Sequence, residues 1–147
     1  MLSSLAEGAE SLVARAALEC GACLIVALPL PRAEYERTFT TAEALAEFRA
    51  LLDLARNWFA LEWAGDNTAD NCRHDPARLD LQYAQAAAYT VWNSQILLAL
   101  WNGIETEPAS QTVRIVRYKS AWSLWPPAHL RSTLGFDILN WVLRQVS

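Results

Sequence analysis

The pattern of charged and uncharged positions is dominated by one long uncharged run. Residues 81–104 carry no charged side chain, although 19% of the whole chain is charged. In front of this run, Asp75 and Pro76 are typical of an N-cap and a first helical residue, and Gly103 follows its last polar residue. The pattern therefore predicts a central helix from Pro76 to Asn102. Because the amide side chains within it are costly to place in lipid, we expect this helix to be buried in protein and not to span a membrane.

Two further helices are predicted in front of the central one. Residues 4–7 have the spacing of a capping box, and the apolar positions that follow predict a helix over residues 5–28. The end of this segment, residues 22–28, also fits a buried strand, because a short apolar run is compatible with both structures. A second capping box at residues 40–43 predicts a helix that continues to about Trp63.

The second predicted helix carries one apolar stripe and three further apolar residues. The stripe contains Leu45, Phe48, Leu52, Ala55 and Phe59. Two leucines fall on the opposite, polar side, and a tryptophan falls at its edge. These three residues, Leu54, Trp58 and Leu61, are therefore candidates for a contact with another protein surface.

The remaining segments favour a mainly α fold. Residues 111–118 are rich in β-forming residues, but the apolar spacing that continues beyond them favours a helix. A final helix is predicted after the proline pair at residues 126–127. We therefore predict a single domain, residues 1–147, with about five helices around the central uncharged helix. The alternative is an α+β fold with a two-stranded ribbon made from residues 22–28 and 111–118.

The charge is unevenly distributed along the chain. The formal net charge is −4, but the segment 108–147 holds five basic residues and one acidic residue. Four of these basic residues form a candidate anion-binding cluster: Arg114, Arg117, Lys119 and Arg131. They could equally pack against the acidic front half of the same molecule or of a second copy. The overall acidity of the chain argues against nucleic acid as a partner.

The three cysteines indicate a reducing compartment. Neither a secretory signal nor an even cysteine count is present, so we expect a cytoplasmic protein with free thiols. Cys20 and Cys23 form a C-x-x-C pair, and Cys72 and His74 form a C-x-H pair. Together they could bind zinc, but small core residues are the better explanation for cysteines in an apolar helix end. The acidic loop at residues 66–71 is expected to be a simple helix connection. We predict neither a metal nor a cofactor.

The central helix offers a candidate ligand site. Four polar side chains fall on one stripe of this helix, and one tryptophan lies beside them: Gln82, Gln85, Tyr89 and Asn93, with Trp92. The stripe is either a narrow face toward solvent or the lining of a cavity that binds a small neutral ligand through hydrogen bonds.

The sequence contains no complete set of catalytic residues. Phosphate-binding glycine motifs and nucleophile motifs are missing, whereas seven tryptophans in 147 residues indicate a large apolar surface. We therefore predict a helical protein–protein interaction module that forms a homodimer and binds a partner protein. The alternative is a small-molecule-binding protein that uses the polar stripe, and an enzyme that uses Cys72 and His74 is a third hypothesis.

Overall fold

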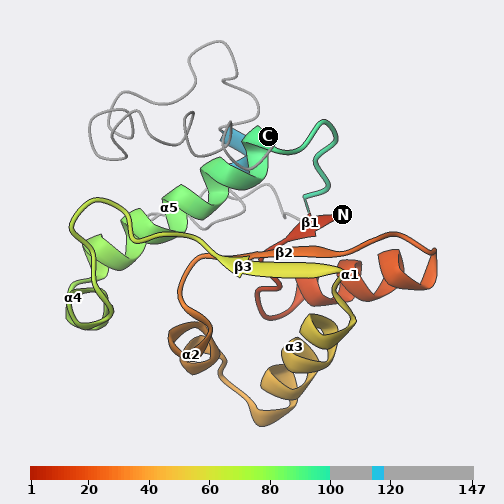
Figure 1. The fold of residues 1–147 in the computed structure, drawn as a ribbon, viewed down its shortest axis with the longest axis horizontal. Helices are drawn as coiled ribbons and strands as arrows, with labels where there is room; N and C mark the ends of the chain where they lie inside the picture. The colour runs from red at the N-terminus through yellow and green to blue at the C-terminus, as the bar shows by residue number, and fades with distance from the viewer. Residues whose placement is uncertain (100–113, 118–147) are drawn as a thin grey trace. The chain divides into compact units, whose positions relative to one another are not determined.

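Three short parallel strands organise the amino-terminal part of the chain (Figure 1). The computed structural model describes residues 1–99 and 114–117. In the sheet, β2 (Ile25–Leu28) lies between β1 (Leu2–Ser3) and β3 (Asn57–Ala60). Because both pairings are parallel, each connection between neighbouring strands has to cross from one end of the sheet to the other.

Helices make these two crossover connections. The first is α1 (Ala9–Glu19), and the second contains α2 (Arg32–Tyr35), the 3₁₀ turn η1 (Glu36–Thr38) and α3 (Ala42–Leu54). Figure 1 shows α1, α2 and α3 on one side of the three strands. An ion pair between Arg15 of α1 and Glu47 of α3 joins the two long helices. The topology is that of a β-α-β-α-β unit.

The core of this unit lies around the central strand. Successive residues of β2, from Val26 to Leu28, are all buried, so both faces of the strand are covered, as is usual in a parallel sheet. Next to α2 and α3, three aromatic rings pack together: the ring of Phe39 lies 4.8 Å from that of Phe48, and Tyr35 makes edge contacts 5.6 Å from each.

Two more helices follow the sheet. They are α4 (Ala69–His74) and α5 (Pro76–Trp92), and residues 114–117 form one further helical turn. The chain divides into two compact units. In the described part of the chain, the first unit contains residues 1–62 and 92–99, and the second contains residues 63–91 and 114–117.

The first predicted helix is shorter than expected at both ends. It begins at Ala9, because Ser4 and Glu7 bond to other parts of the chain and do not form the predicted capping box. After α1, the N–H groups of Gly21 and Ala22 donate to carbonyl groups of the last helical turn, and Gly21 has a φ of 80°. This is a Schellman turn, which ends a helix where glycine can adopt the left-handed conformation.

The second predicted helix is correct only in its first two thirds. Its N-cap is Thr41, whose hydroxyl accepts a hydrogen bond from the N–H of Ala44, and α3 ends at Leu54. Beyond it, residues 57–60 form β3 and pair with β2, so the predicted continuation to Trp63 is wrong. The physical reason is that β2 supplies hydrogen-bond partners for the backbone groups of residues 57–60. In a helix these groups would have to bond within their own segment.

The central helix begins as predicted but ends early. Asp75 accepts a hydrogen bond from the N–H of Ala77, as an N-cap does, and α5 ends at Trp92, ten residues before the predicted end. The next residues, Asn93 and Ser94, have short polar side chains that compete for backbone hydrogen bonds and disfavour a helix. None of the helices in residues 1–99 and 114–117 is long and apolar enough to cross a bilayer.

The fold is therefore helix-rich with a small parallel sheet, and a bundle of five helices is not confirmed. The alternative prediction was right that part of 22–28 is a strand. The predicted pairing of this strand with residues 111–118 was wrong, since β2 pairs with β1 and β3, and residues 114–117 are helical. The final helix predicted after residues 126–127 lies outside the described residues, and the single-domain assignment stays a prediction.

Candidate functional site

The turn between β1 and α1 is held in shape by one carboxylate. Oε2 of Glu10 accepts four hydrogen bonds: from the hydroxyl groups of Ser3 (3.0 Å) and Ser4 (2.8 Å), and from the N–H groups of Ser4 (3.1 Å) and Ala6 (3.3 Å). Both serines are buried. Donors that converge on one oxygen satisfy buried polar groups and fix the path of the chain from the strand into the helix.

The same turn leaves the amino end of α1 open. Gly8, the residue before the helix, has a φ of 99°, and no side chain caps the first N–H groups of α1 in the described part of the chain. A Cβ placed on Gly8 would meet no heavy atom within 4 Å beyond its chain neighbours. Open space therefore lies next to backbone donors at the positive end of a helix dipole.

A second carboxylate near this turn is also engaged. Glu7 accepts hydrogen bonds from the N–H (3.0 Å) and the hydroxyl (2.7 Å) of Thr40, which precedes α3. These hydrogen bonds from Thr40 hold the pKa of Glu7 below its ordinary value. Glu7 and Glu10 thus bind groups other than the first N–H groups of α1.

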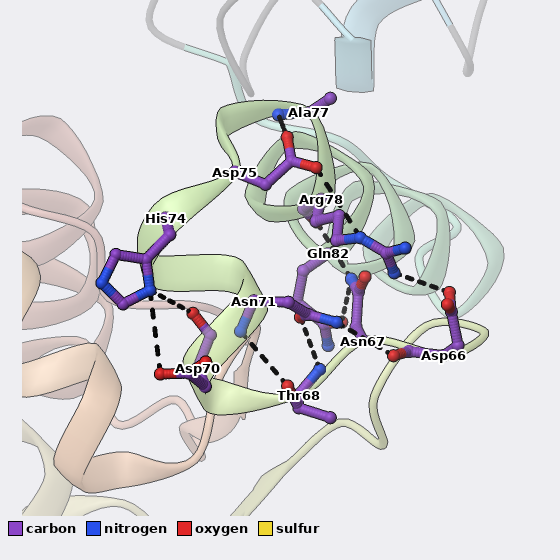
Figure 2. A network of polar contacts seen from close by, with 10 residues as sticks. All are labelled: Asp66, Asn67, Thr68, Asp70, Asn71, His74, Asp75, Ala77, Arg78 and Gln82. Atoms are coloured by element: carbon purple, nitrogen blue, oxygen red, sulfur yellow. Dashed lines mark hydrogen bonds and ion pairs between the residues drawn. The ribbon is translucent and has the colours of Figure 1, made fainter.

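A larger polar network surrounds α4 in the second unit (Figure 2). At its buried end, Oε1 of Gln82 accepts hydrogen bonds from the N–H of Ala64 (2.9 Å) and from Nδ2 of Asn67 (3.4 Å). Nδ2 of Asn67 also donates to the carbonyl oxygen of Arg78 (2.9 Å). Because Gln82 is completely buried, its amide here fixes the loop before α4 to the helix α5.

The exposed part of the network caps helix ends. Thr68 and Asn71 form a reciprocal capping box at the start of α4. The guanidinium of Arg78 lies 2.6 Å from Asp66 and 3.7 Å from Asp75, and the Arg78 contact lowers the pKa of Asp66. The acidic residues of the predicted loop at 66–71 therefore have local structural roles, but only residues 66–68 connect elements, because residues 69–71 form the first turn of α4.

The predicted ligand stripe does not form one accessible face. Gln82 and Gln85 are buried, Tyr89 and Trp92 are half-buried, and Asn93 is exposed beyond the end of α5. Burial raises the pKa of Tyr89 above its ordinary value. Because α5 ends at Trp92, the helical spacing that placed Asn93 on the stripe does not apply to it.

The predicted contact residues are divided between surface and core. Leu54 is 66% exposed and Trp58 is 41% exposed, whereas Leu61 is only 5% exposed. Leu61 therefore packs in the core and contributes nothing to an outer surface. The guanidinium of Arg32 lies over the ring of Trp58 at 5.8 Å, so one face of the indole is already in contact with a cation.

The candidate anion-binding cluster is only partly described. Arg114 pairs with the carboxylate of Asp80 and donates to its carbonyl oxygen, so its charge is already balanced within the second unit. Arg117 is exposed. The other two members, Lys119 and Arg131, lie outside the described residues.

The cysteines do not follow the sequence prediction. Cys20 and Cys23 are exposed, and Cys72 is buried, so only Cys72 has the predicted core position. Burial raises the pKa of the Cys72 thiol above its ordinary value. Nδ1 of His74 lies 2.9 Å from the carbonyl oxygen of Asp70. Within residues 1–99 and 114–117, no three His, Cys, Asp or Glu side chains are grouped to hold a metal ion.

Comparison of the chain with protein-family models, curated proteins and solved structures finds no match. We therefore infer the function from the geometry of the described residues. The residues that sequence reasoning missed are Ser3, Ser4, Gly8 and Glu10 of the β1–α1 turn. In the sequence these residues appear as two serines followed by Glu7 and Gly8. This pattern predicts a capping box unless the short strand β1, which ends at Ser3, is recognised.

Proposed function

We propose that the first unit is a small-molecule-binding module that takes an anionic ligand at the amino end of α1. The observation that carries the proposal is the uncapped helix start next to the open Gly8, directly after a parallel strand. This proposal keeps the alternative prediction of a small-molecule binder, but it changes the ligand from neutral to anionic and moves the site away from the polar stripe of α5.

The topology supports this location. In open sheets with parallel strands, the loops that follow the strands lie at one edge, and ligands commonly bind there. In this chain that edge carries the β1–α1 turn and the start of α3, where Thr40 bonds to Glu7. Two helix amino ends therefore point their positive dipole ends toward the same edge.

The chemistry of the donors indicates the class of ligand. The first N–H groups of α1 are neutral hydrogen-bond donors, and such groups bind phosphate and carboxylate oxygens at helix starts. The neighbouring turn supports this class, because the N–H groups of Ser4 and Ala6, together with two serine hydroxyls, donate to the anionic oxygen of Glu10. A ligand with one phosphate or carboxylate group fits best, because Glu7 and Glu10 are close enough to repel a highly charged one.

A matched pair of variants tests the site. Ala9 is exposed and is the first residue of α1, so Ala9→Glu places a negative charge at the helix start without disturbing the core. We expect Ala9→Glu to weaken the binding of inorganic phosphate or acetate by about tenfold, through repulsion at short range. Ala9→Gln, which has the same size without the charge, should retain binding in the same calorimetric titration.

Unfolding measurements separate this effect from damage to the fold. A negative charge in the first turn favours a helix, so Ala9→Glu should be as stable as the parent protein. Equal anion affinity in Ala9→Glu and Ala9→Gln would refute the site, as would a parent protein that neither phosphate nor acetate stabilises.

A second candidate function, self-association through an apolar surface, is favoured by the exposure of Leu54 and Trp58. Exposed tryptophan is enriched where proteins bind each other, and truncating such a residue often removes most of the binding energy. The predicted homodimer thus remains a proposal, with Leu61 removed from its surface. A partner protein could use the same two residues.

Light scattering over a range of concentrations tests the dimer. We expect Trp58→Ala to shift the equilibrium toward monomer, whereas Leu12→Ala, which truncates a leucine that is 63% exposed on α1, should have no effect. A parent protein that stays monomeric at every concentration would exclude this function and leave the anion site unaffected.

A further inference from the structure

Two exposed thiols lie at the ends of one tight turn in the first unit. Cys20 is the C-cap residue of α1, and Cys23 comes just before β2. Both are exposed and neither is in a disulfide. Free cysteine is among the residues most often buried in proteins, so an exposed pair three residues apart calls for an explanation other than packing.

The turn brings the two cysteines into one local structure. Gly21 adopts a φ of 80°, and the N–H of Ala22 donates to the carbonyl oxygen of Ala17 at 2.9 Å, so the chain reverses its direction directly after Cys20. A Cβ placed on Gly21 would meet no heavy atom within 4 Å beyond its chain neighbours. The turn therefore has open space beside it, in which a small thiol reagent can approach.

One of the two sulfurs has a basic neighbour. Nη1 of Arg56, which precedes β3, lies 3.9 Å from Sγ of Cys23. A guanidinium at this position attracts the carboxylates of an anionic disulfide that approaches the sulfur of Cys23. The turn itself is anchored to the sheet, since the N–H of Arg56 donates to the carbonyl oxygen of Leu24 at 2.9 Å.

From these observations we infer that Cys20 and Cys23 form a reversible dithiol–disulfide site that exchanges with low-molecular-weight disulfides such as oxidised glutathione. This site lies at the end of α1 opposite to the proposed anion site and does not depend on it. The third cysteine, Cys72, takes no part, because it is buried in the second unit.

The exchange proceeds in two balanced steps. The Cys23 thiolate attacks one sulfur of oxidised glutathione, so that a mixed disulfide forms and one glutathione thiolate leaves. The Cys20 thiolate then attacks the Cys23 sulfur, which closes the protein disulfide and releases the second glutathione. The protein loses two electrons and two protons, and oxidised glutathione gains them to give two molecules of reduced glutathione.

Mass spectrometry of the full chain tests the inference. Trypsin cleaves after Arg15, Arg32, Arg56 and Arg73, so that peptide 16–32 holds both Cys20 and Cys23 and peptide 57–73 holds Cys72. After incubation with oxidised glutathione, we expect peptide 16–32 to lose about 2 Da, which corresponds to one closed disulfide. Peptide 57–73 should stay reduced and serves as the internal control.

Single substitutions identify the mechanism. Cys20→Ser and Cys23→Ser remove no packing, because both side chains are exposed, and each should retain one glutathione on the remaining cysteine. A peptide 16–32 from the parent protein that stays reduced, or that carries two glutathiones, would overturn the inference. Either result would leave the proposed anion site untouched.

The rate of the first step tests the order of attack. Arg56→Gln removes the charge beside Cys23 and should slow the formation of the mixed disulfide in Cys20→Ser protein by about threefold, whereas Arg56→Lys should retain most of the rate. Equal rates in Arg56→Gln and the parent background would refute Cys23 as the attacking thiol.

Discussion

Replacing Gln82 with leucine tests whether the central amide is structural or binds a ligand. Gln82 is completely buried, and its Oε1 accepts hydrogen bonds from Ala64 N–H at 2.9 Å and from Asn67 Nδ2 at 3.4 Å. Leucine has similar bulk and no acceptor, so Gln82→Leu removes both hydrogen bonds while it largely fills the same space.

The expected loss is dominated by one backbone group. Ala64 is buried, and a buried N–H without an acceptor destabilises a protein by about 1–3 kcal/mol. Nδ2 of Asn67 keeps its shorter hydrogen bond to the carbonyl oxygen of Arg78, so the loss of the 3.4 Å contact adds little. We therefore expect Gln82→Leu to lower the free energy of unfolding by about 2 kcal/mol.

Urea unfolding measures this difference directly. If the free energy of unfolding depends on urea with a slope of about 2 kcal/mol per M, a loss of about 2 kcal/mol lowers the urea concentration at the midpoint by about 1 M. The slope itself should be the same in the variant and the parent protein. Gln95→Leu is the matched control, because Gln95 is exposed and the same substitution there should change stability by less than about 0.5 kcal/mol. If Gln82→Leu is as stable as the parent protein, Gln82 is not the acceptor of the Ala64 N–H, and the polar stripe is again a candidate ligand site.

Three other outcomes are expected. Arg49 and Arg32 lower the pKa of Glu36 to about 2, so their ion pairs stabilise the fold above the ordinary carboxyl pKa and lose this effect as the pH falls through the range from 4.5 toward 2. At neutral pH the free energy of unfolding of Glu36→Gln should accordingly be lower than that of the parent protein, by no more than about 1 kcal/mol because both arginines are exposed. Near pH 2 the two proteins should unfold at the same temperature. Thr68→Ala should cost about 1 kcal/mol in urea unfolding through loss of the α4 cap, and Thr68→Ser should restore it. Phe48→Ala should cost about 3–5 kcal/mol, because Phe48 is completely buried against two aromatic rings, and a loss below about 1 kcal/mol would contradict this packing.

Local signals in the sequence were sufficient for several elements. The start of α5 follows from Asp75 and Pro76, whose side chains act on the first turn alone. The apolar stripe of α3 correctly placed Phe48 and Leu52 in the core, because a helix repeats its buried face at fixed intervals. The ambiguity of residues 22–28 was also real, and its strand alternative is correct for Ile25–Leu28.

The candidate sites depended on contacts that the sequence does not display. Ser4 and Glu7 were predicted to form a helix capping box, and only the structure shows that Ser4 bonds to Glu10, which reaches back to the turn after β1. Gln82 was predicted as a ligand-binding amide, and only the structure shows that its Oε1 accepts a hydrogen bond from the N–H of Ala64. In each case the deciding hydrogen bonds join groups whose relative positions follow from the fold.

The sequence by itself determined features that are set within a few residues, such as the helix start at Asp75 and Pro76 and the apolar stripe of α3. The tertiary structure alone decided that residues 57–60 are a strand and that Cys20 and Cys23 are exposed. The physical reason is the distance along the chain over which the stabilising contacts act. A short, mostly apolar segment fits a helix or a strand equally well, and β3 is a strand because β2, some thirty residues earlier in the chain, supplies its hydrogen-bond partners.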